Sequence, residues 1–112
     1  MPVFLKIIAS VATIATGLYS LVAPLKVRGF TGLELPGGRG ITEVRAVLGG
    51  FFIALGAAPL LFNSADMYLM LGIAYLAVGA VRAVSMFADK SLVQSNFISL
   101  AVEIVLGVIL VL

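Results

Sequence analysis

The stretch that decides the fold is residues 67–112, MYLMLGIAYLAVGAVRAVSMFADKSLVQSNFISLAVEIVLGVILVL. It consists of two long apolar segments, each close to the roughly 20 residues that a membrane-spanning helix needs, with a short polar break at 89–91. One charged residue lies inside each apolar segment, Arg82 in the first and Glu103 in the second. We therefore predict a helical hairpin that crosses a membrane and carries an arginine and a glutamate within it.

The rest of the chain has the same character, with 62% hydrophobic and 11% charged residues overall. Soluble domains carry charge on about a quarter of their residues. We predict an all-α fold, an integral membrane four-helix bundle with antiparallel up-down topology, in one domain over residues 1–112. The expected spans are about 3–23, 42–62, 67–88 and 92–112. A cleaved signal peptide is the alternative for the first span, but the apolar run is too long and lacks a small-x-small cleavage site.

The composition excludes several kinds of site. The chain has no cysteine and no histidine, which excludes disulfides and both thiolate and imidazole metal ligation. We predict no metal site, no cofactor and no catalytic residues. The 7 basic residues are spread through the segments that flank the spans, which is typical of membrane orientation rather than of nucleic-acid binding. Their asymmetry predicts the inner (cytoplasmic) membrane, with both termini outside the cytoplasm.

The expected helix boundaries follow from turn and capping residues. Residues 25–41 are rich in glycine, which predicts a long connection at the membrane surface. Thr42 is the expected N-cap of the second span, and Ser64 that of the third. Ser91 and Gln94 have the spacing of a capping box, which predicts the start of the fourth span.

Small residues follow one face of the second span. Ala46, Gly50, Ala54 and Ala58 recur every four residues, a pattern that lets another helix approach closely. The partner helix can belong to the same chain or to another, so a homo-oligomer and a larger membrane complex both stay open.

Four polar side chains are expected at one height in the bundle. In antiparallel hairpins, residues equidistant from the turn lie level, and this places Tyr19, Arg45, Arg82 and Glu103 in one layer. Glu43 is expected slightly nearer the cytoplasm. These five residues form the predicted polar cluster, which can bind a small-molecule ligand.

Glu103 is the most costly member of this cluster. It lies about eleven residues from its helix end, on the order of 16 Å at 1.5 Å per residue, too deep for a glutamate to reach the headgroups. A charged side chain at mid-depth costs at least ~2.5 kcal/mol. Glu103 must therefore be protonated, paired with Arg82, or exposed to a wet cavity. A purely structural ion pair, a ligand or ion site, and proton carriage are three interpretations of the pair.

Three short segments carry a resemblance to a known family. Residues 43–50 (EVRAVLGG), 79–82 (GAVR) and 102–107 (VEIVLG) resemble small bacterial four-helix membrane proteins grouped as a domain of unknown function, with a DoxX-like layout. The resemblance implies a four-helix fold and no settled activity. Small multidrug transporters have a similar length, but they depend on an acidic residue in the first helix, and residues 3–23 contain none.

Together these observations predict a small integral membrane protein with a non-enzymatic binding or scaffold role, in contact with membrane lipid. One alternative is a transporter or channel for an ion or small molecule that uses Glu103 and Arg82. Another, suggested by the DoxX-like layout, is a quinone- or lipid-associated redox accessory.

Overall fold

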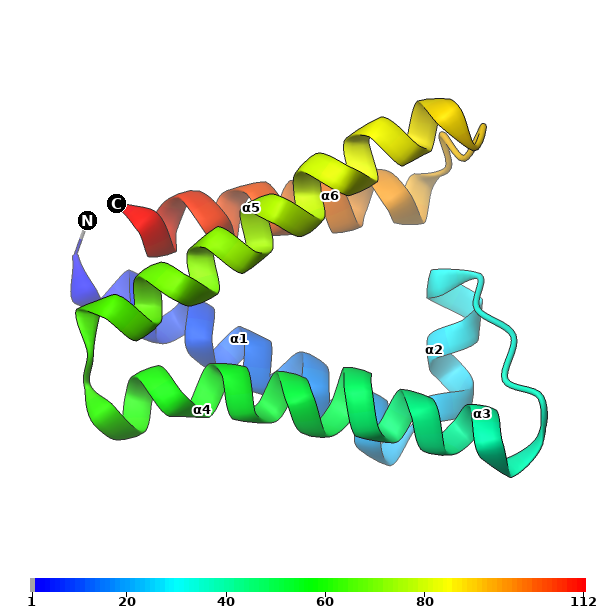
Figure 1. Cartoon of the computed structure of the whole chain (residues 1–112), viewed down its shortest axis with the longest axis horizontal. Helices are drawn as coiled ribbons and strands as arrows, with labels where there is room; N and C mark the ends of the chain where they lie inside the picture. The colour runs from blue at the N-terminus through cyan, green and yellow to red at the C-terminus, as the bar shows by residue number, and fades with distance from the viewer. Residues whose placement is uncertain (1) are drawn as a thin grey trace. The chain divides into compact units, whose positions relative to one another are not determined.

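The computed structural model describes residues 2–112, and every regular element in this range is a helix (Figure 1). This confirms the all-α prediction. Four helices are long and apolar enough to cross a membrane: Val3–Val22, Gly37–Phe62, Ala65–Ala88 and Gln94–Val111. By helix length and composition the chain is a multi-pass membrane protein.

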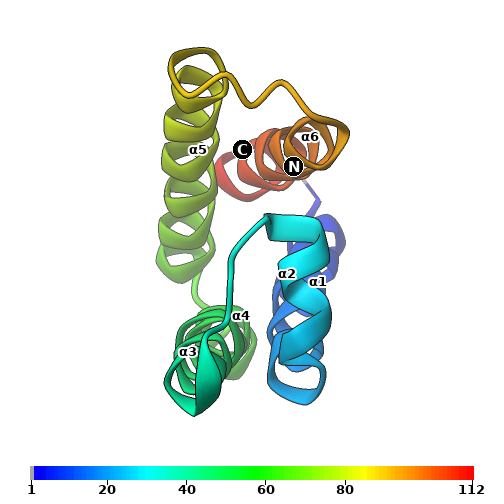
Figure 2. The same cartoon turned by 90° about the vertical axis from the view of Figure 1, so that its right-hand side faces the viewer.

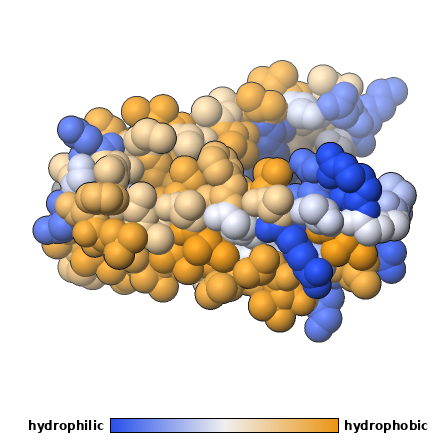
Figure 3. Space-filling view, turned by 60° about the horizontal axis from the view of Figure 1, so that its bottom comes forward, coloured by the Kyte–Doolittle hydropathy of each residue, from blue (hydrophilic) through white to orange (hydrophobic). Residues whose placement is uncertain are grey.

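Hydrophobic side chains cover most of the face seen in Figure 3, and hydrophilic side chains gather at the ends of the helices. The contacts within the chain define two compact units. One is Ser10–Asn63, and the other is Ser64–Leu112 with the residues up to Ala9. Each unit has its own helix pair and its own close contacts.

The Ser10–Asn63 unit pairs a long helix with α1 (Val3–Val22) from Ser10 onward, because the part of α1 up to Ala9 belongs to the other unit. Helix α1 is followed by α2 at Pro24–Thr31. The second long helix is continuous over 26 residues and consists of α3 (Gly37–Glu43), the π-helix η1 (Val44–Phe51) and α4 (Phe52–Phe62).

Glycines bring these two long helices together. A Cβ atom on Gly17 would lie 2.7 Å from the carbonyl oxygen of Gly49, and one on Gly56 would lie 2.6 Å from the carbonyl oxygen of Ser10. Residue numbers rise along α1 as they fall along its partner, so the pair is antiparallel. Backbones approach at these points because glycine has no side chain, which is a common basis of helix packing in membranes.

The predicted connection 25–41 is wrong in part, because it contains helix α2. Pro24 lies at the start of α2, where its missing N–H would have no partner in any case. Gly32 ends the helix with φ +76°, and its N–H donates to the carbonyl of Arg28. The first predicted span ends at residue 23, and Pro24, which follows it directly, begins the next helix.

The second long helix also begins earlier than predicted. Pro36 occupies the N-cap position and the helix starts at Gly37, so Thr42 lies inside the helix and is not its cap. The glycines at the start have low helix propensity, which favoured a turn. A continuous helix satisfies the backbone N–H and C=O groups of these residues internally, which offsets that weak preference.

The π-helix η1 has no counterpart in the prediction. It directs Gly49 toward α1, where Gly49 is buried, while its neighbour Gly50 is exposed. A Cβ on Gly50 would meet nothing closer than the carbonyl of Arg45, at 3.9 Å. The predicted small-residue face therefore differs from the face that packs against α1. Its members are exposed except for Ala58, which is half-buried.

The Ser64–Leu112 unit is a hairpin of α5 (Ala65–Ala88) and α6 (Gln94–Val111). Here too glycines allow close packing: a Cβ on Gly72 would lie 2.7 Å from Leu110 Cβ, and one on Gly107 would lie 2.6 Å from Leu76 Cδ2. The two helices are antiparallel, as predicted for this half of the chain.

The caps of this hairpin are partly as predicted. Ser64 is the N-cap of α5, and its hydroxyl accepts a hydrogen bond from the backbone N–H of Met67 at 3.4 Å. The predicted capping box at Ser91 and Gln94 is wrong. Helix α6 begins at Gln94, and Val93 at the N-cap position makes no side-chain hydrogen bond. Ser91 instead completes the end of α5, because its N–H donates to the carbonyl of Met86 at 2.9 Å.

Replacement of Gly56 by Ala is expected to destabilise the fold by about 1–3 kcal/mol, because the new methyl group meets the backbone of α1. Gly50→Ala is the matched control in the same long helix, and it should be neutral or slightly stabilising because the position is open. The unfolding free energy of each variant is measured by circular dichroism during SDS unfolding in mixed micelles. Equal stability of the two variants would contradict the packing described above.

Candidate functional site

The candidate site is built on an ion pair between the two helices of the hairpin. Arg82 on α5 donates from Nε to Oε1 of Glu103 and from Nη2 to Oε2, both at 2.8 Å. The planar guanidinium thus meets the carboxylate through two parallel hydrogen bonds, the strongest geometry for such a pair. Both oxygens of Glu103 are engaged.

Gly79 lies next to this pair on α5. It precedes Arg82 by one turn of α5, and a Cβ on it would lie 3.6 Å from the Cβ of Glu103. Glu103 on α6 is 8% exposed, whereas 30% of the Arg82 side chain is accessible. The carboxylate is therefore enclosed between the helices, and the guanidinium extends past it to the surface of the hairpin.

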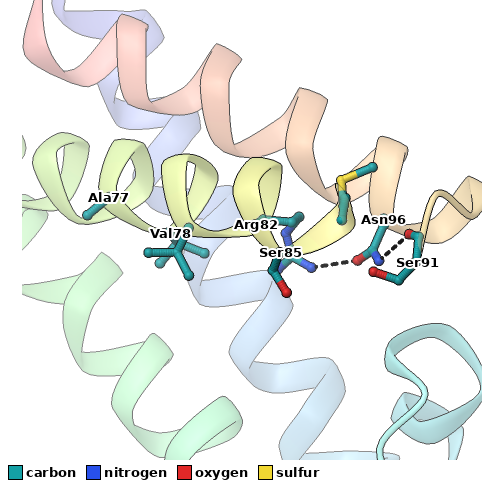
Figure 4. Close-up of a pocket in the computed structure, with 8 residues that line it drawn as sticks. Ala77, Val78, Arg82, Ser85, Ser91 and Asn96 are labelled. Atoms are coloured by element: carbon teal, nitrogen blue, oxygen red, sulfur yellow. Dashed lines mark hydrogen bonds between the residues drawn. The ribbon is translucent and has the colours of Figure 1, made fainter. Parts of the chain in front are cut away.

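Asn96 holds the other side of the guanidinium. Arg82 Nη1 donates to Asn96 Oδ1 at 2.9 Å, and Asn96 Nδ2 donates to the backbone carbonyl of Ser91 at 2.9 Å (Figure 4). Asn96 is not among the site residues that the sequence predicts. Its spacing of seven from Glu103, which places both on one face of α6, is the signal that identifies it.

The guanidinium has donors to spare. It carries five N–H groups, and Glu103 and Asn96 accept three hydrogen bonds from it. Two N–H groups are left for a further acceptor. Because Glu103 already offsets the charge, this acceptor can be an uncharged oxygen.

An open groove of about 470 Å³ runs along the hairpin beside Arg82 (Figure 4). One end is apolar, at Ala77 and Val78, and the opposite end carries polar groups from the α5–α6 connection. The lining residues all belong to α5, α6 and their connection: Ala77, Val78, Val81, Arg82, Ser85, Met86, Ser91 and Asn96. The groove can therefore hold an apolar body at one end and an oxygen-bearing head at the other.

Ser85 is occupied at the polar end. Its hydroxyl donates to a carboxylate oxygen of Asp89, one turn further along the chain. This bond uses the hydroxyl proton of Ser85, which is therefore not available to a ligand in the groove.

The other predicted cluster residues lie in the Ser10–Asn63 unit. Arg45 donates from Nε to the backbone carbonyl of Leu21 at 3.1 Å, where a cation stabilises the C-terminal end of α1. Glu43 pairs with Arg39 of the preceding turn. Tyr19 is exposed. The structure thus brings Arg82 and Glu103 together, and the common layer with Tyr19 and Arg45 stays a prediction.

Comparison with known proteins gives one match. A family model described as "Domain of unknown function (DUF4345)" matches residues 3–112. No curated protein and no solved structure matches the chain. The expected likeness to a domain-of-unknown-function family is confirmed, while bacterial origin and the DoxX-like layout stay predictions.

Replacement of Glu103 by Gln leaves Arg82 without its carboxylate. Removing one partner of a buried pair costs about 3–5 kcal/mol, and since Arg82 is partly exposed we expect the unfolding free energy to fall by about 2–3 kcal/mol. The double variant Arg82→Met, Glu103→Met should recover most of this loss, because no charge is left unpaired. The unfolding free energies of the single and the double variant are measured in mixed micelles. A single variant as stable as the wild type would show that the pair contributes nothing to the fold.

Proposed function

The chain belongs to the DUF4345 family, whose description assigns no function, and we propose that it is a non-enzymatic multi-pass membrane protein that binds a small amphiphilic molecule. The binding site is the groove along the α5–α6 hairpin. The ligand that fits it has an apolar body and a head with at least one hydrogen-bond acceptor.

The observation that carries this proposal is the fixed position of Arg82. Three hydrogen bonds to Glu103 and Asn96 hold its guanidinium at the wall of the groove. A donor group held in place before binding loses little entropy when a ligand arrives. The remaining N–H groups can donate to an oxygen of the ligand without any rearrangement of the pair.

The surroundings make such a hydrogen bond effective. Lipid tails are as apolar as the groove, so an apolar ligand gains little by leaving the bilayer for it. A hydrogen bond in a medium of low dielectric constant is stronger than one in water. The acceptor group therefore supplies the preference for the groove over the bulk lipid, and the apolar end at Ala77 and Val78 supplies the fit.

Transport of an ion or proton by Glu103 is less well supported. Both oxygens of Glu103 accept hydrogen bonds from Arg82, and the residue is almost fully buried. A carboxylate that carries an ion or proton would first have to separate from the arginine. The geometry favours an ion pair that stays closed and supports the groove.

The scaffold part of the proposal rests on the small-residue face of the second long helix. Ala46, Gly50 and Ala54 are exposed, and the space beside Gly50 is open. Such a face suits a helix of another chain, in a homo-oligomer or a larger membrane complex. We place the protein in the inner membrane with both termini outside the cytoplasm, because the basic residues gather in 26–45.

Two valines on α5 test the groove. Val81 and Val84 are both 70% exposed, but only Val81 lines the groove. Val81→Trp should fill the space and lower the amount of co-purified molecule about tenfold, the equivalent of about 1.4 kcal/mol. Val84→Trp, of the same size and exposure, should leave it unchanged. The measurement is mass spectrometry of the organic extract of protein purified in mild detergent, per mole of chain.

Equal amounts of bound molecule in the wild type and both variants would exclude the groove as the binding site. A wild-type extract that contains no molecule in a fixed ratio to the chain would contradict the binding function itself.

A further inference from the structure

We propose that α2 and the segment that follows it form a surface that binds the anionic phospholipid headgroups of the bilayer. The proposal concerns the Ser10–Asn63 unit alone and does not depend on the groove of the α5–α6 hairpin. It rests on the direction of α2, on its exposed side chains and on the distribution of charge.

The first argument is the direction of α2. Figures 1 and 2 both show α2 running across the axes of α1 and α4 rather than along them. If those long helices cross the bilayer, a helix that lies across their ends lies along the membrane surface. Pro24 and Gly32 fix its two ends, so α2 is a defined element between the spans.

The second argument is the mixture of side chains that α2 exposes. Pro24 and Val27 are buried and attach the helix to its own unit. Leu25 and Phe30 are 51% and 48% exposed, and Lys26, between them in the sequence, is exposed as well. Apolar side chains beside a cation are typical of a helix in the headgroup region, where the rings and chains enter the acyl boundary and the amine contacts phosphate.

The third argument is charge. The formal net charge of the chain is +2. Segment 24–45 has four basic and two acidic residues and so holds all of this excess, since the charges elsewhere balance. Arg39 is paired with Glu43, whereas Lys26 and Arg28 form no ion pair within residues 2–112. Juxtamembrane cations of this kind attract anionic lipid.

The exposed apolar side chains favour a phospholipid over a soluble anion as the partner of these cations. Free phosphate or a soluble polyanion would leave Leu25, Phe30 and the half-exposed Leu33 in water. A phospholipid offers a phosphate to the cations and hydrocarbon to these side chains at the same time. The bilayer is therefore the occupant that satisfies both.

The chain contains no tryptophan, so Phe30→Trp introduces a single fluorophore into α2. The full chain is reconstituted in phosphatidylcholine vesicles that contain phosphatidylglycerol. The indole should be shielded from aqueous acrylamide and quenched by brominated lipid. Brominated phosphatidylglycerol should quench it about twofold more than brominated phosphatidylcholine at equal mole fraction, because the cations gather the anionic lipid.

Two controls test whether the preference for phosphatidylglycerol comes from the two cations or from the depth of the indole in the bilayer. In Phe30→Trp combined with Lys26→Gln and Arg28→Gln, the two brominated lipids should quench equally. Val93→Trp places the fluorophore in the α5–α6 connection at similar exposure, 52% for Val93, beside Asp89 and Lys90, whose charges cancel. It should show no preference between the lipids.

Three results would overturn the proposal: free access of acrylamide to the indole in α2, equal quenching by the two lipids in the parent variant, or a preference that survives loss of both cations. None of these readouts involves Val81, so the groove and this surface can fail independently.

Discussion

Helices surrounded by lipid gain little from burying apolar side chains against each other, and this constraint determines how the chain holds together. The contacts that remain are those that lipid cannot provide. Backbones approach closely at Gly17, Gly49 and Gly56 in one unit and at Gly72 and Gly107 in the other. One bidentate ion pair is added to the second set. Helix packing here depends on the absence of side chains more than on their size.

The ion pair is held by the residues around it. Gly79 on α5 lies opposite Glu103, and Glu103 and Asn96 together fix the guanidinium of Arg82 at the wall of the groove. A charge that is costly within a membrane is thereby neutralised and still presents two donors. The same arrangement explains how one hairpin can be stable and offer a polar contact to lipid-soluble molecules.

Much of the fold follows from the sequence, because four apolar runs of sufficient length allow few other structures in a membrane. Arg82 and Glu103 are conspicuous for the same reason, since charges inside apolar spans are rare. That Arg82 faces Glu103 is harder to predict. The relative height of the two residues depends on the length of the α5–α6 connection, which the sequence does not define.

Other features could not be read from residue types. Asn96 looks like an ordinary polar residue near a helix end until its two hydrogen bonds are seen. Pro24 ends one helix and begins the next, and only the second role creates α2. A π-helix cannot be recognised from the periodicity of an almost uniformly apolar segment. The sequence therefore does not predict that Gly49 is buried and Gly50 exposed.

That π-helix has a mechanical consequence. A turn of π-helix contains more residues than a turn of α-helix, so Val44–Phe51 is shorter and wider than the same residues would be as α-helix. A change to α-helix would lengthen the helix and rotate α3 about its axis relative to α4, and each backbone N–H in the segment would exchange an i−5 acceptor for an i−4 acceptor. Arg45 on Leu21 and the contact at Gly49 both lie in this segment and oppose such a rotation. The segment that carries both contacts is thus also the one whose hydrogen-bond pattern sets the rotation of α3 relative to α4.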